Sequence, residues 1–256
     1  MTADDGFDET LFELALRMGD NALILGQRVS AWCGHAPVLE EDIAMANVGL
    51  DLIGQTKLWL GLAGEIEGKG RSADDLAFLR ADRAFRNCLL VEQPNVDYAH
   101  TLMRQYLFDA WHLPMLTALK QSAEPRVAEI AEKSAKEAAY HLERSSDLVI
   151  RLGDGSVESH ERMQAALNAL WPFTGEFVAP DDVDKAAASR GLGPDLSAIA
   201  ERYNETTAAV LRDATLSAPA DAPVRKGGKE GLHSEHLGYL LSEMQWLQRS
   251  HPGAQW

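Results

Sequence analysis

Apolar residues recur every three or four positions along most of this chain, which is the spacing of one face of an α-helix. The first such stretch contains Leu11, Leu14, Met18 and Leu25. It predicts a helix that ends at the segment from Gly34 to Pro37, because glycine and proline interrupt helices. The pattern therefore indicates a first long helix, and no alternating pattern of the strand type follows it.

A second long helix is predicted after Glu40, because acidic residues favour the positive end of the helix dipole. Four glycines recur in this helix: Gly49, Gly54, Gly61 and Gly64. Each glycine costs a helix about 1 kcal/mol relative to alanine and is tolerated where another backbone packs close. We therefore expect this helix to lie at the centre of the protein.

Three further helices are predicted between residues 74 and 152. A short amphipathic helix is expected over residues 74–91, a long apolar helix begins at Pro94, and another runs from Pro125 to Leu152. Short connections join the four long helices, which is typical of an antiparallel four-helix bundle.

The C-terminal part predicts smaller peripheral helices, and the chain as a whole is expected to form one all-α domain. The peripheral helices are expected over residues 181–190, 195–216 and 234–249, with a polar glycine-rich loop over residues 224–231. The predicted domain covers residues 1–256, with a core bundle over about residues 8–152 and peripheral helices over about residues 157–250.

The charge balance excludes two classes of partner. The chain has 24 Lys and Arg against 39 Asp and Glu, a formal net charge of −15. Nucleic acids and anionic membranes bind basic surfaces, so neither is expected. No uninterrupted apolar run reaches the length of a membrane span, and the first residues lack the features of a signal peptide. Cys33 and Cys88 are far apart, so we expect reduced thiols and a cytoplasmic location.

Two acid–histidine pairs are the candidate chemistry of the chain. Asp109 and His112 lie three positions apart in the apolar helix after Pro94, so their side chains project to one side and could share a metal ion. The alternative, which we favour, is a buried polar network in which Asp109 accepts a hydrogen bond from His112 or from the facing helix.

Glu137 and His141 form the second pair, on the next helix, but their spacing is four. A bundle that holds two irons uses a Glu from each of two helices and a Glu-x-x-His from each of the other two. The position three before His141 is Ala138, which has no oxygen to offer. This helix therefore lacks the motif.

The second long helix also lacks Glu-x-x-His, because its core positions near mid-length are Asn47, Asp51 and Gly54. Two or three plausible ligands stand where six are needed, so we expect no metal-binding, catalytic or cofactor-binding residue in this chain. A network of hydrogen bonds and ion pairs is expected instead, from Asp51, Asp109, His112, Glu137 and His141.

Several segments together carry a family resemblance. They are Leu25–Arg28, Trp32–Pro37, Asn47–Gln55, Leu90–Asn95, Phe108–His112, Lys136–Leu142 and Gly227–Gln245. On these segments the chain resembles the non-catalytic structural subunits of bacterial ring-1,2-phenylacetyl-CoA epoxidases. The resemblance covers nearly the whole chain after about residue 10.

The resemblance implies a ferritin-like fold and a place in a multicomponent monooxygenase. In such a complex a catalytic subunit holds the di-iron centre, and a small bridging subunit and a reductase complete the assembly. Electrons come from NADPH through the flavin and iron–sulfur carriers of the reductase. The overall reaction uses O₂ to convert phenylacetyl-CoA to its ring 1,2-epoxide in aerobic phenylacetate degradation. The expected role of this chain is a structural one, without a cofactor of its own, in a hetero-oligomer with the catalytic subunit.

Two other functions stay open on the sequence. The chain could bind its own pair of irons and activate O₂ as a di-iron carboxylate oxygenase subunit. It could also bind a CoA thioester without any partner, through phosphate contacts from Arg225, Lys226 and Lys229. We expect these three charges to be solvated in a flexible turn, so this last function is the least favoured.

Overall fold

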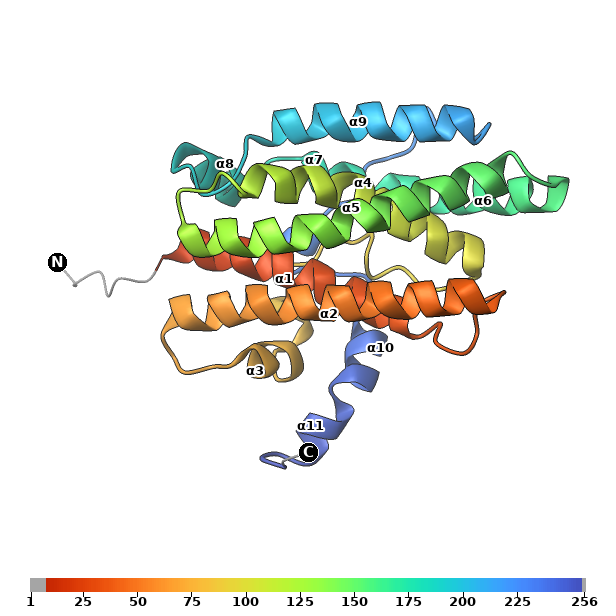
Figure 1. Ribbon diagram of the computed structural model, residues 1–256. Helices are drawn as coiled ribbons and strands as arrows, with labels where there is room; N and C mark the ends of the chain where they lie inside the picture. Colours follow the sequence, from red (N-terminus) through yellow and green to blue (C-terminus); the bar gives the residue numbers. More distant parts are fainter. Residues whose placement is uncertain (1–7, 255–256) are drawn as a thin grey trace.

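Four long helices form the centre of the molecule. The computed structural model describes residues 8–254, and every regular element in that range is a helix. The four are α1 (Glu9–Ser30), α2 (Leu39–Glu67), α4 (Tyr98–Leu119) and α5 (Pro125–Gly153). The helix α1 packs along α2, α4 packs along α5, and α2 also contacts α5, beside which it runs in Figure 1. The predicted all-α class is confirmed, and the bundle is consistent with a ferritin-like arrangement.

Local hydrogen bonds explain where the long helices begin. The Asp8 carboxylate accepts a hydrogen bond from the Leu11 backbone N–H at 3.0 Å, and Asp97 caps α4 in the same way through His100 at 2.8 Å. The turn between α1 and α2 is held by Asp42, whose carboxylate accepts from the Gly34 N–H at 2.9 Å. Gly34 has φ of 81°, a conformation that favours glycine, so the predicted break after the first helix is confirmed.

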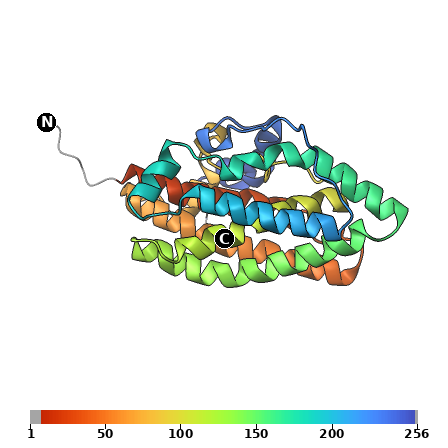
Figure 2. The same ribbon diagram turned by 90° about the horizontal axis from the view of Figure 1, so that it is seen from above.

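Smaller helices cover the bundle. They are α6 (Val157–Leu170), α7 (Gly175–Val178), α8 (Asp182–Ser189) and α9 (Leu196–Asp213). The helix α9 packs against α4 and α5, and α8 packs against α1, as the view from above shows (Figure 2). The predictions for residues 181–190 and 195–216 are confirmed to within a few residues. No helix in the described range is long and apolar enough to cross a membrane.

The last predicted helix is in fact two short ones. α10 (Glu235–Met244) and α11 (Trp246–Ser250) meet at Gln245 and project from the bundle on the side of α3 (Figure 1). The buried Gln245 amide donates to the backbone carbonyls of Ala77 and Arg80, both at 3.0 Å. The prediction of one continuous helix over residues 234–249 was wrong, because the helical pattern does not report this break at a tertiary contact.

The segment predicted as a helix over residues 74–91 is mostly irregular. It contains only α3 (Ala73–Phe78) and the 3₁₀ turn η1 (Asp82–Ala84). Its backbone N–H groups bond to buried side chains of other elements: Arg86 to Asp20 at 2.8 Å, Cys88 to Asn21 at 2.9 Å, and Leu89 to Glu176 at 2.7 Å. Since tertiary partners satisfy these groups, the segment needs no helical ladder, and the prediction was wrong.

The helix α2 is covered on one side only. A side chain at Gly49 would meet the Ser30 hydroxyl at 2.8 Å, and one at Gly64 would meet the Arg71 carbonyl at 2.2 Å, so these two glycines do allow close packing. At Gly54 and Gly61 an added Cβ would meet nothing within 4 Å. The prediction that α2 lies at the centre was therefore wrong for the side that carries these two glycines.

The glycine-rich loop is anchored over residues 227–229. The buried Glu176 carboxylate accepts from the Gly227 N–H at 2.8 Å and from the Lys229 N–H at 3.3 Å. The Lys229 ammonium pairs with Asp184 at 2.7 Å. Gly228 is buried, and a Cβ there would meet the Asn87 carbonyl at 2.1 Å. The prediction of a flexible turn was wrong for residues 227–229, and Lys229 is not free to bind a phosphate. Arg225 and Lys226 are exposed, as predicted.

A buried ion pair gives the first prediction. Asp20 and Arg80 pair with side-chain exposures of 0% and 4%, and a second bond joins Arg80 Nη1 to the Asp20 carboxylate at 3.0 Å. Changing Asp20 to Ala leaves a buried guanidinium without its carboxylate. We expect the free energy of unfolding, measured by urea denaturation, to fall by about 3–5 kcal/mol.

The exposed pair of Asp147 and Arg151, 3.4 Å apart on α5, provides the matched control. Changing Asp147 to Ala is expected to alter the free energy of unfolding much less, because both charges stay hydrated. Equal losses in the two variants would contradict the importance of the buried pair.

Candidate functional site

The five predicted residues gather between α2, α4 and α5. Asp109 and His112 on α4 and His141 on α5 are buried, with exposed fractions of 0%, 1% and 1%. Asp51 on α2 and Glu137 on α5 lie half-buried where these two helices meet. The structure thus brings the five predicted residues to one region of the bundle, and we call them the interior cluster.

Asp109 is bonded to two uncharged side chains. It accepts from the Gln105 amide at 2.7 Å, one turn earlier on α4, and from the Ser145 hydroxyl of the facing helix α5 at 2.8 Å. Burial raises the pKa of Asp109 to about 8, although both hydrogen bonds oppose that shift. The Asp109 carboxyl is therefore mostly protonated at neutral pH.

The two histidines differ in their surroundings. His141 Nε2 lies 3.0 Å from the Asp51 carboxylate, which reaches in from α2. His112 packs against Phe108, with ring centroids 4.6 Å apart, and stacks on Trp111. Burial, together with the neighbouring His141, lowers the pKa of His112 to about 3, and burial lowers the pKa of His141 against the pull of Asp51. Both imidazoles are therefore uncharged at neutral pH.

Glu137 is joined to α2 by a residue that the sequence did not single out. The Gln55 amide donates to the Glu137 carboxylate at 2.9 Å, and burial raises the pKa of Glu137. Asn47 and Gly54, which we placed at core positions, are exposed, whereas Gln55 is buried. That assignment was wrong because α2 is apolar on both sides, so periodicity could not tell its inner side from its outer side.

The donor set does not fit a pair of irons. Among residues 8–254 no group of three or more His, Cys, Asp or Glu side chains is arranged to hold a metal ion. Asp109 is surrounded by Gln105 and Ser145, and the position of the missing acid, Ala138, is fully buried. A di-iron bundle needs about six inward ligands, four of them carboxylates.

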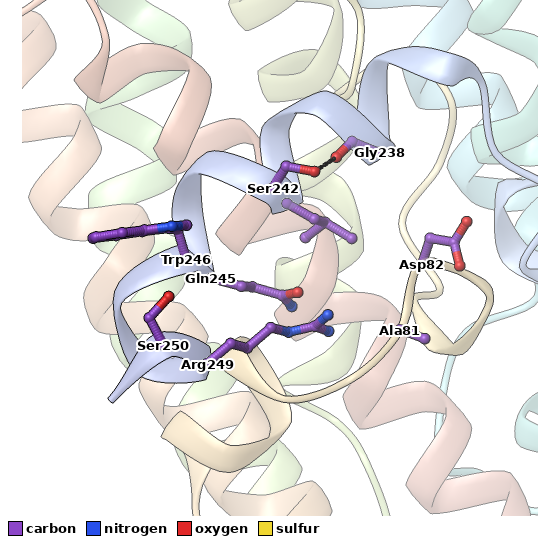
Figure 3. Close-up of a pocket in the computed structure, with 9 residues that line it drawn as sticks. Ala81, Asp82, Gly238, Ser242, Gln245, Trp246, Arg249 and Ser250 are labelled. Carbon is purple, nitrogen blue, oxygen red and sulfur yellow. Dashed lines mark hydrogen bonds between the residues drawn. The ribbon is translucent and has the colours of Figure 1, made fainter. Parts of the chain in front are cut away.

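A surface groove of about 420 Å³ lies apart from this cluster, between η1 and the two C-terminal helices (Figure 3). Its polar lining residues Gln245 and Arg249 already donate to backbone carbonyls of residues 77–80. These bonds attach the C-terminal helices to the segment after α3. The groove therefore serves the packing of α10 and α11.

The fold and the interior cluster define an all-helical bundle protein in which Asp51, Asp109 and Glu137 bond to other side chains of the same chain. The family model described as phenylacetic acid catabolic protein matches residues 2–256, and the chain belongs to this family. It is similar to one of the subunits of the 1,2-phenylacetyl-CoA epoxidase of Escherichia coli strain K12. The two chains are 48% identical over 241 residues, which cover 94% of this chain and 97% of the relative. The family resemblance predicted from the sequence is confirmed.

The raised pKa of Asp109 predicts a pH dependence of stability. The unfolded chain ionises Asp109 near its usual pKa of 3.8, whereas the folded chain keeps the proton up to about pH 8. Between these values the unfolded state binds fewer protons, so Asp109 makes the free energy of unfolding fall by about 1.4 kcal/mol per pH unit as the pH rises. Changing Asp109 to Asn keeps a neutral hydrogen-bonding group and removes this contribution.

Urea denaturation of the wild type and Asp109→Asn at several values between about pH 5 and pH 7 measures the difference. As the pH rises, the free energy of unfolding of Asp109→Asn should increase steadily relative to that of the wild type. The exposed Asp147 supplies the control, since Asp147→Asn should parallel the wild type. Parallel curves for Asp109→Asn would contradict the raised pKa.

Proposed function

We propose that this chain is a non-catalytic structural subunit of a phenylacetyl-CoA 1,2-epoxidase and pairs with the catalytic di-iron subunit in aerobic phenylacetate degradation. The similarity to the E. coli protein supports membership of such a complex, because it extends over nearly the full length of both chains. That relative is named as one subunit of its enzyme, which supports a hetero-oligomer. The small bridging subunit and the reductase, which carries flavin and iron–sulfur groups, would complete the assembly.

One observation carries the non-catalytic role: the carboxylates of the interior bond to neighbours of this chain. Asp109 accepts from Gln105 and Ser145, and Asp51 is joined to His141. A ligand to iron must direct its oxygen or nitrogen lone pairs at the metal, together with several other ligands. The pairing of these groups supports an interior that maintains the shape of the bundle without metal.

The interior cluster would contribute stability to the complex through its geometry. The bond from Asp109 to Ser145 joins α4 to α5, and the bonds of Asp51 and Glu137 join α2 to α5. These contacts hold three of the four long helices at fixed positions. A rigid bundle of this kind presents a constant surface to a catalytic partner, which lowers the ordering cost of association.

Metal analysis tests this role against the alternative that the chain binds its own irons. We expect well under one iron per chain after expression in iron-supplemented medium, because the donor set lacks the six ligands of a di-iron site. The catalytic subunit, purified in the same way, is the positive control. About two irons per chain, retained after dialysis against a mild chelator, would instead establish the oxygenase alternative.

Replacement of His112 separates a structural role from a chemical one. His112→Ala removes a buried ring that packs against Phe108 and Trp111, and we expect the free energy of unfolding to fall by about 2–4 kcal/mol. Turnover per assembled complex should stay unchanged. The exposed His251 provides the control, since His251→Ala should change neither quantity. A His112→Ala variant that assembles fully and still loses turnover would contradict the structural role.

A further inference from the structure

The start of α10 is attached to the rest of the protein through His233, one residue before the N-cap of that helix. His233 Nδ1 lies 2.9 Å from the Glu92 carboxylate, and Nε2 lies 3.1 Å from the Phe85 carbonyl oxygen. The side chains of His233 and Glu92 have exposures of 4% and 0%, so water cannot replace these partners. The imidazole therefore joins α10 to the irregular segment before α4.

Both ring nitrogens of His233 face oxygen atoms. A carbonyl oxygen has no proton to donate, so the bond to Phe85 requires a proton on Nε2. The bond to Glu92 requires a second proton, between Nδ1 and the carboxylate oxygen, because two facing lone pairs repel each other. A neutral imidazole carries only one proton. Making both bonds therefore takes one proton more than a neutral ring and an ionised carboxylate hold together.

The surroundings of Glu92 favour a charged partner. The carboxylate accepts from the Ser234 N–H at 2.6 Å, from the Asn87 amide at 3.2 Å and from His233. Of these three donors only His233 can carry a positive charge. A negative group is also favoured at this place, because Ser234 begins α10 and the N-terminal end of a helix is positive. The extra proton thus makes a buried, charge-assisted hydrogen bond.

Other charged or titratable groups around this pair come from α1, from the segment before α4 and from α10. They are Asp20 paired with Arg80, Glu13 paired with Arg86, Arg28 bonded to backbone carbonyls, the exposed Glu235 and the half-buried His236. Arg86 also donates to the Phe85 carbonyl at 2.9 Å, so this oxygen keeps a donor without His233. Loss of the proton on Nε2 therefore breaks the bond between His233 and Phe85 and removes the charged partner of Glu92.

The protonation of His233 follows from opposing effects. Burial lowers the pKa of His233, whereas the hydrogen bonds to Glu92 and Phe85 and the charges of Glu92 and Asp20 raise it, and the net shift is upward from the usual 6.5. A group with a raised folded-state pKa stabilises the fold fully below its unfolded pKa. That contribution is lost as the pH rises to the folded pKa. The attachment of α10 through His233 should therefore weaken above pH 6.5.

We propose that His233 and Glu92 form a proton-dependent latch that fastens the start of α10 to the segment before α4, and that loss of one proton opens it. The opening is local, because the other end of α10 has an attachment that does not titrate. There the Gln245 amide donates to the Ala77 and Arg80 carbonyls. The latch lies outside the four long helices, and α10 projects from them (Figure 1). The inference is independent of the proposed function, since it concerns contacts within this chain alone.

Two measurements on the full wild-type chain test the latch. NMR titration gives the pKa of His233 in the folded chain and in urea. Hydrogen exchange between about pH 6 and pH 9, corrected for the intrinsic rate of each amide, gives the protection of residues 231–236. We expect this protection to be constant below pH 6.5 and to fall about tenfold per pH unit from there to the folded pKa. Residues 246–250 should keep their protection throughout.

Two substitutions that do not titrate remove one bond each. His233→Asn places an amide nitrogen near the position of Nδ1 and can keep the bond to Glu92. His233→Gln places it near the position of Nε2 and can keep the bond to Phe85. In both variants the protection of residues 231–236 should be independent of pH where that of the wild type falls. The matched control is His251→Asn at the exposed His251, which should follow the wild type.

Several results would count against the latch. A pKa of His233 in the folded chain at or below its value in urea would overturn it. An equal fall of protection in the wild type and in both His233 variants would also overturn it, because another group would then control the segment. A simultaneous loss of protection over residues 231–250 would show that the attachment at Gln245 opens as well, and would overturn the local opening. A total fall in protection equal to tenfold per unit of the measured pKa difference supports the latch.

Discussion

The buried carboxylates of this bundle depend on partners that the chain itself supplies, because burial removes their hydration. This constraint accounts for most of the structure outside the regular helices. Asp20 holds Arg80 and the backbone of Arg86, and so fixes the segment after α3. Glu176 holds the glycine-rich loop through the N–H groups of Gly227 and Lys229. Buried carboxylates thus position the connections between helices.

The same constraint shapes the function we propose. Burial disfavours the charged forms of Asp109, His112 and His141, so that Asp109 remains mostly protonated and the two imidazoles remain neutral at neutral pH. The hydrogen bonds of the cluster join α2 and α4 to α5.

The sequence predicted some residues of the interior cluster correctly and missed others. Asp109 and His112 were predicted to project to one side from their helical spacing, and both are buried. His141 was predicted to join the same network from the next helix, and it lies in the same region of the bundle. Gln55 was missed and Asn47 and Gly54 were misplaced, since α2 has apolar residues on both sides and periodicity gives no orientation. The irregular segment before α4 was missed because its hydrogen-bond partners lie on α1 and α7, far away along the chain.

By itself the sequence determined the all-α class, the positions of the four long helices and the family, because apolar spacing, capping residues and glycine–proline breaks are local signals. It also determined that Ala138 leaves His141 without the acid of a Glu-x-x-His motif. Only the tertiary structure decided which side of α2 faces the bundle, where the buried carboxylates find their partners and that the last helix breaks at Gln245. Those outcomes depend on contacts between residues distant in sequence, and a local pattern of apolar positions contains no information about them.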